Sequence, residues 1–161
     1  MQEILLLTTG GTIDKVYFDA RSSYEVGASI VANLLEQAEV RHPYKTIEVL
    51  QKDSLELTDD DRETIRNTIL AHPNQQIVIT HGTDTMTETA AAIAGISDRT
   101  IVLTGSLAPA RFAMTDAMFN IGMAFAAVQS NKAGVYIVMN GSVFDASKVH
   151  KNRQENAFVG I

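Results

Sequence analysis

Short apolar runs alternate along this chain with longer segments in which the apolar residues recur at helical spacing. Five runs are rich in β-branched residues and are typical of strands buried in a parallel sheet; they cover residues 4–8, 46–50, 77–80, 100–103 and 135–139. Four segments with the spacing of a helix face cover residues 28–39, 59–71, 84–94 and 115–130. The second of these follows Thr58, a suitable N-cap, and opens with three acids that favour the positive end of a helix dipole. The alternation predicts a single α/β domain with a doubly wound, mostly parallel sheet, a three-layer sandwich of the flavodoxin-like or Rossmann-like kind.

Composition and charge narrow the class of protein. The chain has 161 residues, of which 45% are apolar and 20% charged, as in ordinary globular domains. Its net charge of −6 argues against a nucleic-acid surface, and no apolar run has the length of a membrane span. There is no cysteine, so disulfides and thiol nucleophiles are excluded. The first strand follows Met1 almost directly, without the regions of a secretory signal, so we expect a cytoplasmic protein.

Glycines and hydroxyl or amide side chains gather where four of the predicted strands end. The four stretches read TTGGT, ITHGTDTMTET, LTGSLAP and MNGSVFD. Any one of them could be only a tight turn or a helix cap. Because ligands bind at the carboxyl ends of the strands in a doubly wound sheet, the four together predict a functional site there.

Two of these turns have specific chemistry. Gly10 and Gly11 let the backbone turn sharply and approach a ligand, which leaves Thr12 at the rim of the sheet. In HGTDT, Asp84 could hold an ammonium group, and the backbone N–H groups around Thr83 could stabilise an anion. A phosphate site is the alternative, but neither phosphate-binding glycine motif follows any strand.

Several stretches resemble the successive signatures of the bacterial-type L-asparaginase family. They are TTGGTID, HGTDTMTETA, VLTGSLAP, TDAMFNIGMA and VMNGSVFDASKVHK, and they follow the family's order over about residues 4 to 151. The resemblance implies an L-asparagine amidohydrolase that forms an acyl-enzyme ester and releases L-aspartate and ammonia. It implies no cofactor, and the four histidines lack the spacing of metal ligands. His81 is expected to be a packed, hydrogen-bonded residue rather than a catalytic base.

The resemblance also assigns roles to individual residues. Thr12 matches the nucleophile, and Thr83, Asp84 and Lys151 match a second cluster across the same pocket. A threonine hydroxyl needs such a cluster to accept its proton, and the N–H groups near Gly11, Thr12 and Thr83 could hold the oxyanion. The alternative for Lys151 is a solvated surface lysine.

The remaining site residues are less closely determined. A tyrosine on the segment after the Gly-Gly turn completes the family's site; Tyr24 is favoured because Val-Gly follows it two residues later, and Tyr17 is the alternative. In the loop QKDS, Asp53 and Ser54 are expected to bind substrate, together with Gly11, Thr83 and Asp84. Aligning the loop on Asp53 puts Gln51 where the family carries a serine, and Ser54 and Lys52 are the candidates to compensate.

The expected assembly follows from what the chain lacks. Most of the family has a second α/β domain, which is absent from this sequence, so we expect a natural short form in which residues 1–161 are the catalytic domain. We expect a homodimer or a dimer of dimers, formed by apolar faces of the first and fourth helices: Ile30, Leu34, Leu35, Phe119, Met123 and Phe125. Asparagine should be preferred over glutamine. Two other functions stay open: an ammonia-releasing amidotransferase subunit, and a non-catalytic amino-acid-binding module.

Overall fold

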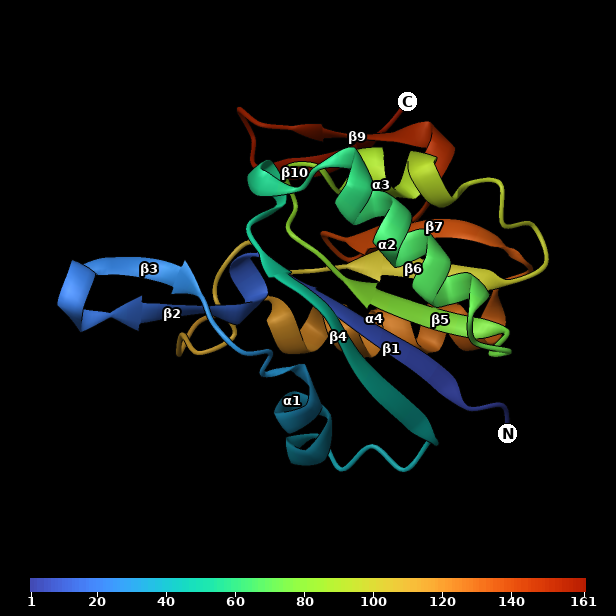
Figure 1. Ribbon diagram of the computed structural model, residues 1–161, viewed down its shortest axis with the longest axis horizontal. Coiled ribbons are helices and arrows are strands. Elements are labelled where there is room, and N and C mark those ends of the chain that lie inside the picture. Colours follow the sequence, from blue (N-terminus) through green and yellow to red (C-terminus); the bar gives the residue numbers. More distant parts are fainter.

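A central sheet of six strands organises the molecule, seen in a computed structural model that describes all residues, 1–161 (Figure 1). The strand order is β4-β1-β5-β6-β7-β8, and every neighbouring pair is parallel except β7 and β8. The strands are β1 (Ile4–Gly10), β4 (Tyr44–Lys52), β5 (Gln76–Thr80), β6 (Thr100–Thr104), β7 (Gly134–Met139) and β8 (Ser142–Asp145). All five predicted strands are present, and the doubly wound fold class is confirmed. Because β4 and β5 lie on opposite sides of β1, the order switches between β1 and β5, where such sheets place their ligands.

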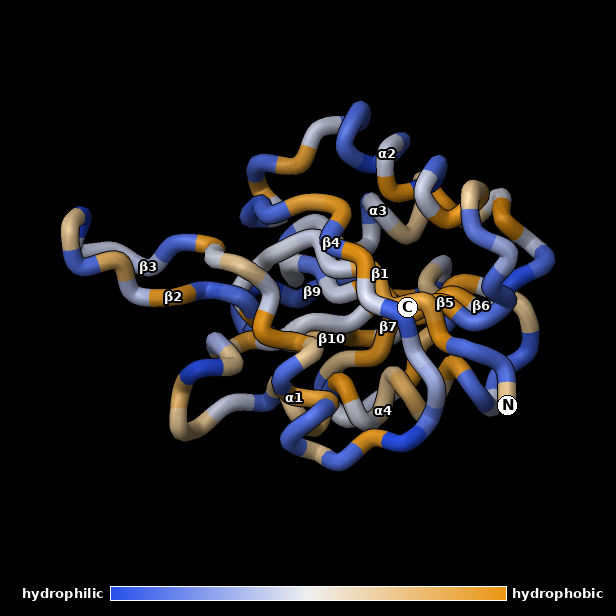
Figure 2. The backbone as a smooth tube through the Cα atoms, turned by 60° about the horizontal axis from the view of Figure 1, so that its bottom comes forward, coloured by the Kyte–Doolittle hydropathy of each residue, from blue (hydrophilic) through white to orange (hydrophobic).

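Helices cover both faces of the sheet. Successive side chains of a strand point to opposite faces, so Leu5 and Leu7 of β1 join a core with α2 (Asp59–Leu70) and α3 (Met86–Ile93). Ile4 and Leu6 join a second core with α1 (Val31–Gln37) and α4 (Ala117–Ser130). All four side chains are fully buried, and burial of each stabilises the fold by roughly 1.5–3 kcal/mol. The three-layer sandwich is therefore confirmed, and the most hydrophobic segments follow the inner strands (Figure 2).

The helix boundaries differ from the predicted ones for identifiable reasons. The predicted cap is confirmed at α2, where Thr58 and Asp61 form a reciprocal capping box. Helix α1 is shorter than residues 28–39 because Ser29 and Ile30 bind the side chain of Asp14 instead. Helix α3 begins only at Met86, since residues 83–85 form a bend.

The sequence pattern missed strand β8 at the edge of the sheet and two hairpins outside it, whose strands are all short and mostly exposed or half-buried. The first hairpin joins β2 (Lys15–Phe18) to β3 (Ser23–Val26), directly after the turn that carries Thr12. It extends well away from the sheet (Figure 1). The second joins β9 (Val149–Asn152) to β10 (Ala157–Gly160) and places β9 next to α3.

The apolar residues expected to form a dimer interface are mostly part of the core. Leu34, Leu35 and Phe125 are buried in the core shared with α1 and α4, and Ile30 and Met123 pack against it. Of the six, only Phe119 is an exposed large hydrophobic residue. The expectation that these six residues form the interface is therefore wrong for all but Phe119, because the others are covered within the protein's own core.

No helix in the structure combines the length and the hydropathy that crossing a membrane requires.

Candidate active site

Three turns at the carboxyl ends of β1, β4 and β5 pack backbone against backbone. Gly11 has a φ of 90°, and a Cβ at this position would lie 2.4 Å from the backbone nitrogen of Gly82. A Cβ on Gly82 would in turn lie 2.6 Å from the Cβ of Ser54. Only glycine permits such an approach. The three turns therefore bring Thr12, Ser54 and Thr83 to one place at the switch point of the sheet.

Lys151 completes a cluster with Thr83 and Asp84. Its Nζ donates to Thr83 Oγ1 over 2.8 Å and to Asp84 Oδ1 over 2.9 Å. The lysine comes from β9, 67 residues along the chain from Asp84, and its side chain is only 12% exposed. Lys151 is therefore not a solvated surface lysine. The ion pair leaves Asp84 Oδ2 without a protein partner, on a side chain that is 34% exposed.

Thr12 has a free hydroxyl and directly follows Gly11, whose backbone packs against Gly82, the residue before Thr83. Thr12 is half-buried, and its side chain makes no hydrogen bond within the chain. The Gly11 N–H donates to Lys52 O over 2.9 Å, so this one of the N–H groups near the turn is already bound within the chain. The Thr83 N–H has no backbone acceptor and is free to meet a ligand.

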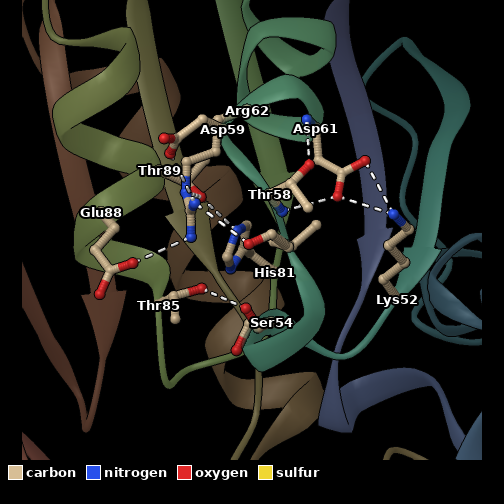
Figure 3. Close-up of polar contacts among 11 residues, drawn as sticks. Lys52, Ser54, Thr58, Asp59, Asp61, Arg62, His81, Thr85, Glu88 and Thr89 are labelled. Carbon is tan, nitrogen blue, oxygen red and sulfur yellow. Dashed lines mark hydrogen bonds and ion pairs between the residues drawn. The ribbon is translucent and has the colours of Figure 1, made fainter.

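The loop after β4 brings the Ser54 side chain to the Gly82 turn, whereas the side chains of Gln51 and Lys52 at the end of β4 do not reach it. Ser54 is 1% exposed, and its backbone oxygen accepts a 2.8 Å hydrogen bond from Thr85 Oγ1. Lys52 instead donates to both carboxylate oxygens of Asp61, over 3.1 and 2.9 Å, as Figure 3 shows. Gln51 is exposed. Of the two candidates to compensate for the missing serine, Lys52 thus meets the Gly10–Gly11 turn only through its backbone, and its ammonium group is bound by Asp61.

Asp53 is paired with Lys15, a residue that the sequence did not single out. The two charged groups are 3.2 Å apart, and the Leu55 N–H donates to the same carboxylate over 3.0 Å. Burial opposes ionisation of Asp53, but these two donors outweigh it and hold the pKa of the carboxyl below its usual value. Asp53 is therefore an ionised carboxylate whose negative charge is balanced by Lys15.

The two candidate tyrosines face each other across the β2–β3 hairpin. Their rings make an edge-to-face contact with centroids 5.3 Å apart, and Tyr24 makes a second one with Phe112 at 5.5 Å. Both side chains are about half exposed, and neither hydroxyl makes a hydrogen bond. Tyr24, but not Tyr17, lines a hollow of about 460 Å³ that Lys15 and Asp53 also line. The structure thus brings Tyr24 to the loop of Asp53 and leaves Tyr17 outside it.

His81 is a buried structural residue, as expected. Its Nδ1 donates to Gly82 O over 2.7 Å, which leaves Nε2 to accept from Thr89 Oγ1, also over 2.7 Å (Figure 3). Thr89 Oγ1 in turn accepts from Arg62 Nε over 3.2 Å. Complete burial lowers the pKa of His81 to about 4, and the nearby Arg62 charge acts in the same direction. The imidazole is therefore neutral and fixes the Gly82 carbonyl next to Thr83.

Arg62 and Thr89 were also missed, because a helical arginine among acids looks like a solvated charge. Arg62 is 7% exposed and pairs with Glu88 over 3.1 Å. No group of three or more histidine, aspartate or glutamate side chains is arranged to hold a metal ion.

Comparison with known proteins agrees with this geometry. The sequence matches the family described as Asparaginase, N-terminal, over residues 3–159. The chain belongs to the asparaginase family. It is 33% identical to a glutaminase-asparaginase from Acinetobacter glutaminasificans, over 97% of this chain and 52% of the relative. It is 32% identical to L-asparaginase 2 from Escherichia coli (strain K12), over 94% of this chain and 47% of the relative.

Other relatives and solved structures extend the comparison. A glutamyl-tRNA(Gln) amidotransferase subunit from Methanococcus vannielii is 29% identical over 96% of this chain and 40% of the relative. The thermostable L-asparaginase from Thermococcus kodakarensis superimposes with a TM-score of 0.85 at 27% identity, covering 99% of this chain and 51% of that one. A probable cytoplasmic L-asparaginase from Campylobacter jejuni superimposes with a TM-score of 0.82, also at 27% identity, over 99% and 52% of the two chains. The chain thus spans about half the length of the asparaginases that it matches.

Proposed function

We propose that this chain is an L-asparagine amidohydrolase that releases L-aspartate and ammonia through a threonine nucleophile. The observation that carries the proposal is the contact of Lys151 with Thr83 and Asp84, together with the close packing of the Thr12 turn against the turn of Thr83. Membership of the asparaginase family supports the same reaction class. Residues 1–161 are proposed to be sufficient for this reaction.

The proposed reaction has two steps. Thr12 Oγ attacks the side-chain amide carbon, and its proton passes by way of the Thr83 and Lys151 cluster to the amide nitrogen. The carbon–nitrogen bond then breaks, ammonia leaves, and an ester links Thr12 to the aspartyl group. Water attacks the ester carbon, and the bond to Thr12 Oγ breaks to release aspartate. The free Thr83 N–H is proposed to stabilise the oxyanion that forms in both steps.

The ends of the substrate are proposed to bind at two separate groups. Asp84 Oδ2 accepts from the substrate ammonium, since its other oxygen is already bound by Lys151. Ser54 donates to the substrate carboxylate, and Lys15 neutralises Asp53 so that the loop does not repel that carboxylate. The extra methylene of glutamine displaces one of these ends, and a misplacement of about 1 Å can cost roughly a hundredfold in rate. We therefore propose that asparagine is clearly preferred.

Tyr24 is proposed as the tyrosine that covers the site. It is carried by the hairpin that follows Thr12 and lines the same hollow as Asp53. We also propose a homodimer or a dimer of dimers, now with the exposed Phe119 as the apolar contact, and a cytoplasmic location. Likeness to the probable cytoplasmic enzyme from Campylobacter jejuni supports the location.

Ammonia release by the purified chain tests the proposal. We expect turnover of asparagine, a loss of more than about a hundredfold in Thr12→Ala, and substantial activity in the matched Thr12→Ser, which keeps a hydroxyl. Unchanged circular dichroism would show that both variants fold. Near-normal turnover by Thr12→Ala would refute the nucleophile.

The same assay with glutamine separates the competing functions. A kcat/KM for glutamine comparable to that for asparagine would refute the proposed preference and favour ammonia release of the glutaminase or amidotransferase kind, to which two relatives belong by name. No ammonia from either amide, with both amino acids still bound in calorimetry, would establish a binding module instead.

A further inference from the structure

Asp14 is a buried acid that the proposed chemistry does not use. Its side chain belongs to a residue only 1% exposed, just after the turn of Thr12. Oδ1 accepts from Ser29 Oγ over 3.1 Å and from the Ile30 N–H over 3.0 Å, whereas the buried Oδ2 has no hydrogen-bond partner. A buried, incompletely paired carboxyl costs stability, so its presence calls for a role.

The backbone of Asp14 joins the Thr12 turn to both ends of the β2–β3 hairpin. Its N–H donates to Gly11 O over 3.1 Å and closes the turn that carries Thr12. Its carbonyl accepts from the Gly27 N–H over 3.0 Å, where the chain leaves the hairpin, and β2 begins at the next residue, Lys15. The side chain adds the bonds to Ser29 and Ile30, in the segment that follows Gly27 and leads from the hairpin to α1.

Charged groups hold this junction from two other elements. Arg111, in the connection after β6, donates to Asp14 O and to Ala28 O, each over 3.3 Å. Glu48 of β4 accepts from the Ser29 N–H over 3.3 Å. Burial raises the pKa of Asp14 to about 6, against the opposing effects of its hydrogen bonds and of Arg111. The carboxyl is therefore mainly ionised at neutral pH, which strengthens its bonds to Ser29 and Ile30.

We propose that Asp14 is a positioning residue that fastens the hairpin, and with it Tyr24, at a fixed orientation to Thr12. A two-stranded hairpin is marginally stable alone, so the attachments of its stem decide where its side chains lie. Away from the stem, the aromatic contact with the body of the protein is that of Tyr24 with Phe112. Loss of the carboxyl frees the segment that leaves the hairpin at Ser29 and Ile30, and this lets Tyr24 move relative to Thr12. The bearing on catalysis rests on the proposed function, whereas the fastening does not.

Limited trypsin digestion tests the fastening without reference to activity. Arg21 lies at the tip of the hairpin with a side chain 72% exposed. We expect cleavage after Arg21 to be at least about fivefold faster in Asp14→Ala and in Ser29→Ala than in the unaltered chain. Asp14→Asn keeps an acceptor for Ser29 and Ile30 and should restore slow cleavage. Asp98→Ala, which removes an acid with a 71% exposed side chain, is the matched control and should change nothing.

Kinetics test the positioning role. In Asp14→Ala we expect a loss in kcat of about tenfold or more with little change in KM, because Asp84 and Ser54 are not attached through the hairpin and Lys15, which pairs with Asp53, lies at the start of β2 and not in the segment that the Asp14 carboxyl holds. Asp14→Asn should recover most of the loss. Cleavage rates unchanged in both Asp14→Ala and Ser29→Ala would overturn the fastening, and faster cleavage with an unchanged kcat would overturn the positioning role. If the chain released no ammonia, the proposed function would fail while the digestion result would still decide the fastening.

Discussion

Two buried ionisable residues, His81 and Asp14, have pKa values displaced into the same pH range but with opposite consequences for stability. His81 is neutral in the folded chain down to about pH 4, whereas an unfolded histidine takes up a proton near 6.5. Between these values the unfolded state binds more protons, so stability falls as the pH falls from about 6.5 to 4. Asp14 is protonated below about 6 when folded and below 3.8 when unfolded. Its contribution to stability therefore falls as the pH rises from about 4 to 6.

Single variants should separate the two effects. In Asp14→Asn only the histidine effect remains, so the free energy of unfolding should rise more steeply between pH 4 and 6.5 than in the unaltered chain. The displacement of His81 from 6.5 to about 4 sets an upper bound on that rise of roughly 3 kcal/mol. In His81→Asn only the Asp14 effect remains, so the free energy of unfolding should fall as the pH rises from about 4 to 6. Urea unfolding at several pH values measures both slopes, and parallel curves for all three proteins would contradict the assignment.

Lys151 and Thr83 should act as one unit, since the lysine donates directly to the threonine hydroxyl. We expect Lys151→Met and Thr83→Val each to lower kcat by about a hundredfold or more, and the double variant to lose far less than the product of the two losses. Lys148→Met replaces an exposed lysine nearby and should be nearly silent. Losses that multiply fully would show that the two residues act independently.

At the scale of elements, the glycine positions divide into two kinds. A Cβ at Gly82 would lie 2.6 Å from Ser54, so Gly82→Ala must push two turns apart and should lower both stability and kcat. Gly122 is exposed within α4, and a Cβ there would meet no other atom within 4 Å, so Gly122→Ala should stabilise the chain by about 0.5–1 kcal/mol. Thermal unfolding of the two variants, beside their turnover, measures the contrast. A lower melting temperature for Gly122→Ala would contradict it.

The elements that the sequence predicted are those with a strong periodic pattern. The inner strands are buried on both faces and read as continuous apolar runs, and Thr58 carries a local capping signal. The β2–β3 and β9–β10 hairpins lack such a pattern, because their strands have little buried surface. The start of α3 was misplaced because residues 83–85 form a bend in which their side chains bind Ser54 and Lys151, partners far away along the chain.

In the candidate site, too, the residues within recognisable motifs were predicted and those held by long-range contacts were missed. The resemblance to the asparaginase family predicted that Thr12, Thr83, Asp84 and Lys151 share one site, and the fold brings the last three into hydrogen-bond contact. The roles of Arg62 and Lys15 depend on partners 26 and 38 residues away along the chain, Glu88 and Asp53, which no local pattern reveals. Long-range ion pairs are set by tertiary packing, and sequence spacing alone does not report them.

At the scale of the whole molecule, the proposed assembly can be tested by a change at one exposed side chain. Phe119 is 63% exposed on α4, and we expect the chain of 17.5 kDa to sediment as a dimer or a larger assembly. Phe119→Lys should shift it to the monomer, because burying a lysine charge at an apolar contact is unfavourable. Leu70→Lys makes a similar exchange on α2, at the other face of the sheet, and should leave the assembly intact. A monomeric unaltered chain would refute the homodimer.

The aromatic pair on the hairpin, Tyr17 and Tyr24, makes the intrinsic fluorescence of the chain sensitive to the position of the hairpin. The sequence contains no tryptophan and four tyrosines, and Tyr17 and Tyr24 supply half of them. Their rings touch each other, and Tyr24 also touches Phe112 on the body of the protein. Any displacement of the hairpin changes the surroundings of half of the tyrosines. Intrinsic tyrosine fluorescence therefore follows the hairpin in stopped-flow mixing without an attached dye.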